Sequence, residues 1–110
     1  KLVARWGRDP ACNAHKAFSS LAELDEANSL SAVIGPGCSS GCFSTAWLTT
    51  HRNVLQVSYS CSAPALLDFP TFARTVSTGA NAITVLQQFF QRYSWKLTTF
   101  VCLRGSEWDH

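Results

Sequence analysis

The sequence predicts an α/β fold in which helices flank a parallel sheet. Short apolar segments with strand-like composition alternate with longer segments whose apolar residues recur at helical spacing. The apolar segments are continuous, which is typical of parallel strands buried on both faces. Strand–helix alternation with short connections implies right-handed crossovers and a parallel sheet. With 46% hydrophobic residues among 110, the chain has enough apolar side chains to build a core.

The first two expected elements are a short strand and a helix. Apolar residues within 2–6 predict the end of a strand, and the turn-forming residues 7–10 break it. Residues 13–28 then repeat at a period close to that of a helix, which predicts an amphipathic helix. Its apolar face consists of Ala14, Ala17, Phe18, Leu21 and Leu24.

The middle of the chain predicts two more strands with a helix between them. Residues 32–34 are apolar, and Pro36 ends this strand because it fixes φ and lacks a backbone donor. We expect a helix over residues 40–52 and the next strand over residues 54–59. Residues 60–70 contain serines, prolines and an aspartate, a composition typical of a loop.

The last third predicts an extended segment, a helix and a strand. These cover residues 72–76, 81–93 and 97–103, and the last segment is rich in β-branched and aromatic residues. The residues expected to point inward from the helix are Ile83, Leu86, Phe89 and Phe90. No helix precedes the first strand and only polar residues follow the last one. We therefore expect a slice of a larger sheet rather than a closed domain.

The charge of the chain excludes some classes of function. Nine lysines and arginines against seven acidic residues give a net charge of +2, without the clustered cationic footprint of a nucleic-acid binder. No apolar run approaches the roughly 18 to 20 residues of a membrane span. We expect no nucleic-acid partner and no membrane helix in these residues, and an export leader would lie outside this chain.

Five cysteines favour an oxidising compartment, because small cytosolic proteins rarely carry so many. In a parallel sheet, every strand-to-helix turn lies at the carboxyl edge. Cys12, Cys38 and Cys61 follow the first three expected strands. Cys42 lies in the first turn of the second helix, and Cys102 lies near the end of the last strand. The predicted fold therefore gathers four or five cysteines at one edge.

This placement suggests two disulfides. Cys12 and Cys38 would join neighbouring strand ends, and closing that loop stabilises a protein by about 3.5 kcal/mol in the chain-entropy account. Cys42 and Cys61 are the natural second pair, which leaves Cys102 free. Two alternatives stay open here: five reduced core cysteines, or a zinc site, although the closely paired spacing of structural zinc sites is missing.

The segment GPGCSSG at residues 35–41 is the most informative turn. Glycine permits positive φ and a close approach to the backbone. The free amides at the start of the next helix make Gly37, Cys38, Ser39 and Ser40 candidate residues for binding a ligand or an anion. A plain tight turn with Ser39 or Ser40 as the helix N-cap is the commoner use of such a segment.

Residues 37–41 also match the G-x-S-x-G pattern of a serine-hydrolase nucleophile elbow, in the expected strand–turn–helix context. Ser39 would be the nucleophile, with Asp68 and His110 as its partners in chain order. His110 ends a polar tail, which is a poor position for an oriented catalytic base. The hydrolase is therefore kept as an alternative, and we expect this segment to catalyse nothing.

Several short motifs occur in a specific order. They are V-I-G-P-G-C at residues 33–38, V-S-Y at 57–59, P-T-F-A-R-T at 70–75 and Y-S-W at 93–95. With these motifs, the chain resembles the extracellular ligand-binding region of receptor guanylate cyclases, the natriuretic-peptide-receptor-like family. That family is related to type I periplasmic binding proteins, so the resemblance implies that the sheet belongs to lobe 1 of a two-lobed fold.

The resemblance also carries implications for single residues. In that family, a cysteine placed like Cys12 pairs with the cysteine placed like Cys38. Some members hold a chloride ion against the turn, which would involve Gly37 and Cys38, although the supporting serine upstream is not evident here. The first two helices form a dimer contact in the family, so His51 is a candidate interface residue of a homodimer. No metal or other cofactor is implied.

Class C receptors and bacterial periplasmic amino-acid-binding proteins share the fold and are the alternative. They hold a ligand carboxylate with a serine pair after this turn, which Ser39 and Ser40 match, and with a Ser/Thr step after the next strand. That second position reads Cys61-Ser62-Ala63 and lacks threonine. The cysteine after the Gly-Pro-Gly turn favours the guanylate cyclase branch. Arg74 is expected to make structural contacts.

The resemblance thus predicts that residues 1–110 are a partial receptor ligand-binding domain, a segment of lobe 1. It would lie on the extracellular side of the plasma membrane, in the ectodomain of a single-pass receptor that senses a peptide or another external ligand. A guanylate cyclase domain would belong to the rest of such a receptor and not to this segment.

Overall fold

The computed structural model describes residues 3–7, 10–27, 29–99 and 101. The elements are, in order, α1 (Ala14–Ala27), β1 (Ala32–Ile34), α2 (Ser39–His51), β2 (Leu55–Ser58), the 3-10 helix η1 (Pro64–Asp68), β3 (Phe72–Arg74) and α3 (Gly79–Arg92). All three predicted helices are present close to their expected bounds. The predicted loop after β2 contains η1, which begins at a proline, as short helices often do.

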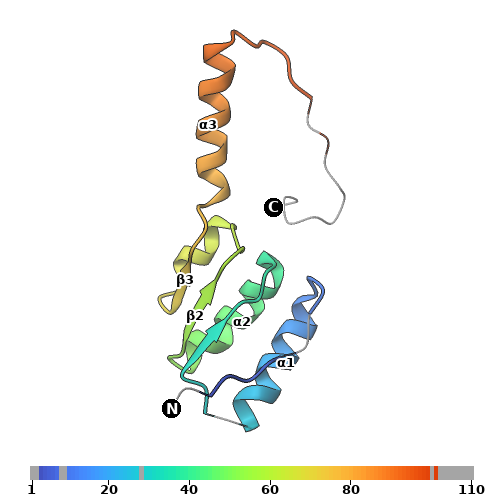
Figure 1. Cartoon of the computed structure of the whole chain (residues 1–110), viewed down its shortest axis with the longest axis vertical. Helices are drawn as coiled ribbons and strands as arrows, with labels where there is room; N and C mark the ends of the chain where they lie inside the picture. Colours follow the sequence, from blue (N-terminus) through green and yellow to red (C-terminus); the bar gives the residue numbers. More distant parts are fainter. Residues whose placement is uncertain (1–2, 8–9, 28, 100, 102–110) are drawn as a thin grey trace.

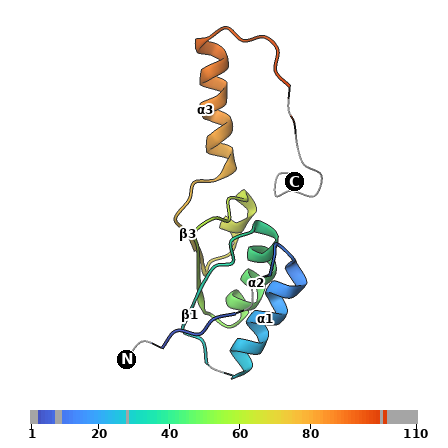
Figure 2. The same ribbon diagram turned by 45° about the vertical axis from the view of Figure 1, so that its right-hand side comes forward.

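The three strands form a parallel sheet in the order β1-β2-β3. Ala32 of β1 is paired with Leu55 of β2, and Gln56 of β2 with Phe72 of β3. In Figure 1, α1 and α2 lie side by side along the sheet, and the turned view in Figure 2 shows the same arrangement. The predicted α/β fold, a parallel sheet with flanking helices, is confirmed.

The apolar core lies between helix α2 and the segment that follows β2. It joins Cys42 and Ala46 of α2 to Cys61, Leu66 and Phe69 from the segment that follows β2. These side chains are small or compact, so the helix approaches the strands closely and η1 closes the end of the cluster. Helix α1 packs on α2 from outside, through two small buried contacts, Ala17 and Leu21.

Only one face of the sheet is covered within the described residues. The buried side chains of β2 are polar, Gln56 and Ser58, and they point toward α2. On the strands, Ile34 is 84% exposed and Leu55 is 49% exposed. The expectation of strands buried on both faces is therefore wrong for this part of the chain, because a second layer is needed to cover the other face.

The first and last predicted strands do not form in the described parts of their segments. Residues 3–7 have no regular structure, and Trp6 is 91% exposed. Residues 97–99 and 101 have none either, while residues 2, 100, 102 and 103 lie outside the described part. A single strand is not stable without a neighbour to pair its backbone, and the described parts of these segments pair with no strand of the sheet.

Helix α3 stands away from the sheet in both views (Figure 1 and Figure 2). None of its residues is buried, so the expectation that Ile83, Leu86, Phe89 and Phe90 point into a core is wrong for the described structure. At its end, the Phe89 ring stacks on Tyr93 with centroids 5.9 Å apart. The helix is strongly amphipathic, so its apolar face is built for a partner that the described residues do not supply.

We expect this chain to self-associate at micromolar concentration, because the exposed apolar face of α3 gains free energy when another surface covers it. Sedimentation velocity should show dimers or larger species for the natural sequence. Leu86→Lys should shift the distribution toward monomer, whereas the matched change Gln87→Lys on the same helix should not. A monomeric natural chain would contradict this expectation.

Candidate functional site

The three strands end at a common edge, where their connections converge. Because the strands are parallel, their carboxyl ends lie together. The turn at residues 35–38 follows β1, residues 59–63 follow β2, and residues 75–78 follow β3. In open α/β sheets, ligands bind outside the carboxyl ends of the strands. We call this region the carboxyl edge.

The turn after β1 is held by backbone and side-chain hydrogen bonds. Gly35 has φ of 101°, a conformation that other residues rarely adopt, and its N–H donates to the Val57 carbonyl at 2.8 Å. The Gln56 amide donates to the Gly35 carbonyl at 3.0 Å, and the Ser58 hydroxyl donates to the Pro36 carbonyl at 3.0 Å. The buried side chains of Gln56 and Ser58 in β2 therefore hold the turn in place through hydrogen bonds.

Two disulfides cross this edge. Cys12 is bonded to Cys38, with Cα atoms 5.2 Å apart, and Cys42 is bonded to Cys61, with Cα atoms 6.5 Å apart. These are the pairings that the placement of the cysteines along the chain predicts. Since these four sulfurs are bonded in two pairs, neither a zinc site nor four reduced thiols fits the structure. Cys102 lies outside the described residues.

The two serines after the turn are occupied by the protein itself. Ser39 is only 1% exposed, and its hydroxyl oxygen accepts the N–H of Ala63 at 3.3 Å. Ser40 donates its hydroxyl to the Cys12 carbonyl at 2.9 Å. The N-cap of α2 is Cys38, so the expectation of a serine N-cap is wrong. Ser39 and Ser40 thus tie the turn to the neighbouring segments.

The burial of Ser39 also weighs against the hydrolase alternative. A nucleophile elbow works because its serine is exposed at the top of a strand–turn–helix unit. Ser39 is buried, and Asp68 lies exposed at the end of η1. His110 lies outside the described residues. The G-x-S-x-G match is explained by packing, since Cβ at Gly41 would meet Pro36 at 3.0 Å.

After β2, hydrogen bonds from Arg74 hold both ends of the three-residue segment Cys61–Ala63. Arg74 of β3 donates from one guanidinium nitrogen to the Cys61 carbonyl at 3.1 Å and to the Ala63 carbonyl at 2.9 Å. This agrees with the structural role expected for Arg74. The Ser62 carbonyl between them accepts the N–H of Gly79, the first residue of α3, at 3.2 Å. Ser62 is thereby held at the rim of the carboxyl edge.

The charge around this edge favours an anionic group. Residues 27–67 contain no aspartate or glutamate. The Arg74 guanidinium is hydrogen-bonded to the Cys61–Ala63 segment, and its second terminal nitrogen is buried without a hydrogen-bond partner among the described residues. A region lined by one sign of charge attracts ligands of the opposite sign.

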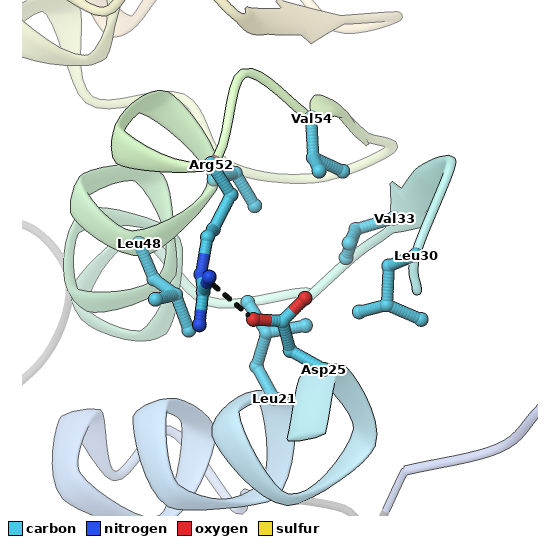
Figure 3. Close-up of a pocket in the computed structure, with 8 residues that line it drawn as sticks. Leu21, Asp25, Leu30, Val33, Leu48, Arg52 and Val54 are labelled. Carbon is cyan, nitrogen blue, oxygen red and sulfur yellow. Dashed lines mark ion pairs between the residues drawn. The ribbon is translucent and has the colours of Figure 1, made fainter. Parts of the chain in front are cut away.

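A hollow lies at the opposite end of the helices from the carboxyl edge and is shown in Figure 3. Asp25 of α1 and Arg52 after α2 form an ion pair across it, with Arg52 Nε 2.9 Å from Asp25 Oδ2. The other lining residues are mainly aliphatic, among them Leu21, Leu48 and Val54. The ion pair links α1 to the end of α2, and its two side chains are the charged residues that line the hollow. We therefore assign this ion pair a structural role.

His51 is exposed at the end of α2. It precedes the start of β2, whereas the carboxyl edge lies where the strands end. Trp47 lies one helical turn before His51 and is 69% exposed. Its ring packs edge-on against the ring of Phe69, with the two centroids 5.1 Å apart. The two side chains belong to one outer helix surface. The structure therefore does not bring His51 together with the turn residues.

Sequence reasoning missed Gln56 and Ser58, which hold the turn, and Tyr59, which lies beside it. The one signal for Gln56 is a large polar residue inside an otherwise apolar strand.

Among the described residues, no cluster of three potential metal ligands occurs. The helices within the described ranges are too short or too polar to span a membrane.

Comparison with known proteins agrees with this geometry. The family described as receptor family ligand binding region matches residues 1–110. Gamma-aminobutyric acid type B receptor subunit 1 of Mus musculus is 31% identical over 91 residues, 80% of this chain and 10% of the receptor, and that of Rattus norvegicus gives the same values. The chain thus spans about a tenth of these relatives. A guanylate cyclase is not specifically supported. The chain belongs to the receptor family ligand-binding regions.

Proposed function

We propose that this chain is part of the extracellular ligand-binding lobe of a class C receptor, the alternative considered from the sequence, and that it binds a small ligand through a carboxylate. The observation that carries this is the carboxyl edge itself. A turn fixed by two disulfides faces a serine-containing segment next to a guanidinium, and the segments that form the edge contain no acidic residue.

The comparisons support this choice over the guanylate cyclase that the motifs suggested. The relatives found are receptor subunits for γ-aminobutyric acid, a small amino acid, and belong to class C. Their similarity runs through 80% of the chain. Two disulfides in so short a segment support an extracellular location, because such bonds persist in oxidising compartments.

A receptor guanylate cyclase with a peptide ligand is the second candidate. The observation in its favour is the Cys12–Cys38 bridge, which the resemblance to that family implied and which is present in the structure. Nothing in the disulfide distinguishes a peptide from an amino acid as ligand. The ligand class therefore separates the two candidates.

Three further expectations stay proposals. Residues 1–110 would be a segment of lobe 1, and the outer helix surface with His51 would be its contact in a homodimer. Chloride at Gly37 and Cys38 stays a prediction. Ser62 is more open to a ligand than Ser39, since it is half-buried at the rim while Ser39 is buried.

We expect the chain to bind γ-aminobutyric acid more tightly than 1,4-diaminobutane, which has the amine but no carboxylate. Ligand-observed NMR suits the weak affinity expected of a partial site. Ser62→Ala should weaken binding of γ-aminobutyric acid by about tenfold through loss of a hydrogen bond to a charged group. Ser19→Ala, an exposed serine on α1, is the matched control.

Equal binding of the two compounds would contradict the proposed carboxylate site. Binding of a natriuretic-type peptide without binding of the amino acid would favour the second candidate instead. Unchanged affinity after Ser62→Ala would remove that serine from the site while leaving the ligand class intact.

A further inference from the structure

Tyr59 lies directly over the turn at the carboxyl edge. A Cβ placed on Gly37 would stand 2.9 Å from the Tyr59 hydroxyl oxygen and 3.4 Å from the ring carbon that bears it. The backbone of Gly37 is not in the left-handed region, in contrast to Gly35. Glycine is therefore needed at residue 37 for room rather than for backbone freedom, and the room is taken by Tyr59.

Packing does not account for this tyrosine. It is 62% exposed, although an aromatic side chain gains free energy from burial. It makes no ring–ring contact within the described ranges. Its hydroxyl also has no hydrogen-bond partner among the residues that the structure describes. A phenol in this situation can donate a hydrogen bond to a ligand without giving up an internal one.

The surroundings define the ligand group that would be bound. The Tyr59 ring lies beside Gly37, and along the chain Tyr59 stands between Ser58, whose hydroxyl is bonded to the Pro36 carbonyl, and the Cys61–Ala63 segment. The Arg74 guanidinium is hydrogen-bonded to two carbonyls of that segment, and residues 27–67 contain no acidic side chain. An anionic group meets attraction here, and a phenol O–H donates a strong hydrogen bond to a carboxylate.

We propose that Tyr59 is a ligand-contacting residue that selects a small carboxylate. Its ring forms one wall of the site and its hydroxyl donates to the ligand's carboxylate oxygen. Gly37 leaves the space in which the ring lies, so the two residues act as a pair. The proposal rests on the carboxylate-binding function proposed above and adds the residue that recognises the ligand.

The chain contains only two tyrosines, which makes a selective experiment possible. With tyrosine labelled with ¹³C in the ring, γ-aminobutyric acid should shift the signals of Tyr59 and leave those of Tyr93 unchanged. Tyr93 is 58% exposed and lies after α3, so it is a matched control. Tyr59→Phe should weaken binding by about tenfold or more, and Tyr93→Phe should not change it.

Gly37→Ala should displace the Tyr59 ring, move its NMR signals before any ligand is added, and weaken binding as well. Because Tyr59 is exposed, Tyr59→Phe should leave the circular dichroism spectrum and the melting temperature unchanged, so a loss of affinity is not a loss of fold. If the natural chain binds γ-aminobutyric acid and Tyr59→Phe binds it equally, the role of Tyr59 is refuted and the proposed function stands. If the natural chain does not bind it at all, the proposed function fails and this inference fails with it.

Discussion

Reducing both disulfides should abolish the cooperative unfolding transition of this chain. The bridges join residues 26 and 19 positions apart. In the chain-entropy account, loops of these lengths stabilise the folded state by about 3.5 and 3 kcal/mol. A small domain has only about 5 to 15 kcal/mol of stability in total. Since half of the sheet is uncovered here, the reduced chain has little left to hold it together.

The measurement is thermal unfolding followed by circular dichroism, in oxidising buffer and in excess reductant with thiols then blocked. A variant with Cys42→Ala and Cys61→Ala lacks one bridge and keeps the other, so it measures the two contributions separately. Its melting temperature should fall by more than the loss of the bridge alone explains, because both sulfurs lie in the core and their loss also leaves a cavity. Cys102→Ser is the control for a change of cysteine number outside the two bridges. A melting temperature that is the same in both buffers would contradict a structural role for the disulfides.

Gln56→Ala should destabilise the chain by about 3 kcal/mol or more. The Gln56 side chain is fully buried, and its amide nitrogen donates to the Gly35 carbonyl and, at 2.8 Å, to the Thr45 hydroxyl oxygen. Its amide oxygen accepts the Thr49 hydroxyl at 3.1 Å. Truncation leaves buried polar groups without their partner, each at a cost of about 1 to 3 kcal/mol, and opens a cavity.

Urea unfolding of Gln56→Ala, compared with Gln87→Ala on the exposed surface of α3, checks this result. The control should change the free energy of unfolding by less than about 0.5 kcal/mol. Gln56 also holds the turn at Gly35. In the variant, we expect the turn to be displaced in a fraction of the molecules, and the affinity for the ligand should fall as that fraction rises. Equal midpoints for the two variants would show that water replaces the amide without cost.

The helices and the parallel order of the strands were predictable because they depend on local patterns. The spacing of Ala17 and Leu21 predicts the buried face of α1, and the apolar run before Gly35 predicts β1. The strands expected at residues 2–6 and 97–103 had the right composition but no neighbour. Composition reports which side chains suit a sheet, whereas a strand exists only when another backbone pairs with it.

The candidate site was predictable to the level of segments and not of side chains. The sequence indicates that the Gly-Pro-Gly-Cys turn and the cysteines meet at one edge, since topology alone brings them there. It does not indicate that Ser39 turns inward to Ala63 or that Tyr59 turns outward over Gly37. Orientations of this kind depend on which neighbour fills which space, and that is settled only when the elements are packed.

The order of the bridges along the chain has a consequence for biosynthesis. Cys12 pairs with Cys38 before Cys42 is reached, and Cys42 then pairs with Cys61, so neither loop contains a cysteine of the other pair. Each loop can close without waiting for the other, and the short separations keep the entropy of closure small. A chain emerging from its amino end into an oxidising compartment can therefore complete each cross-link as soon as its second cysteine appears.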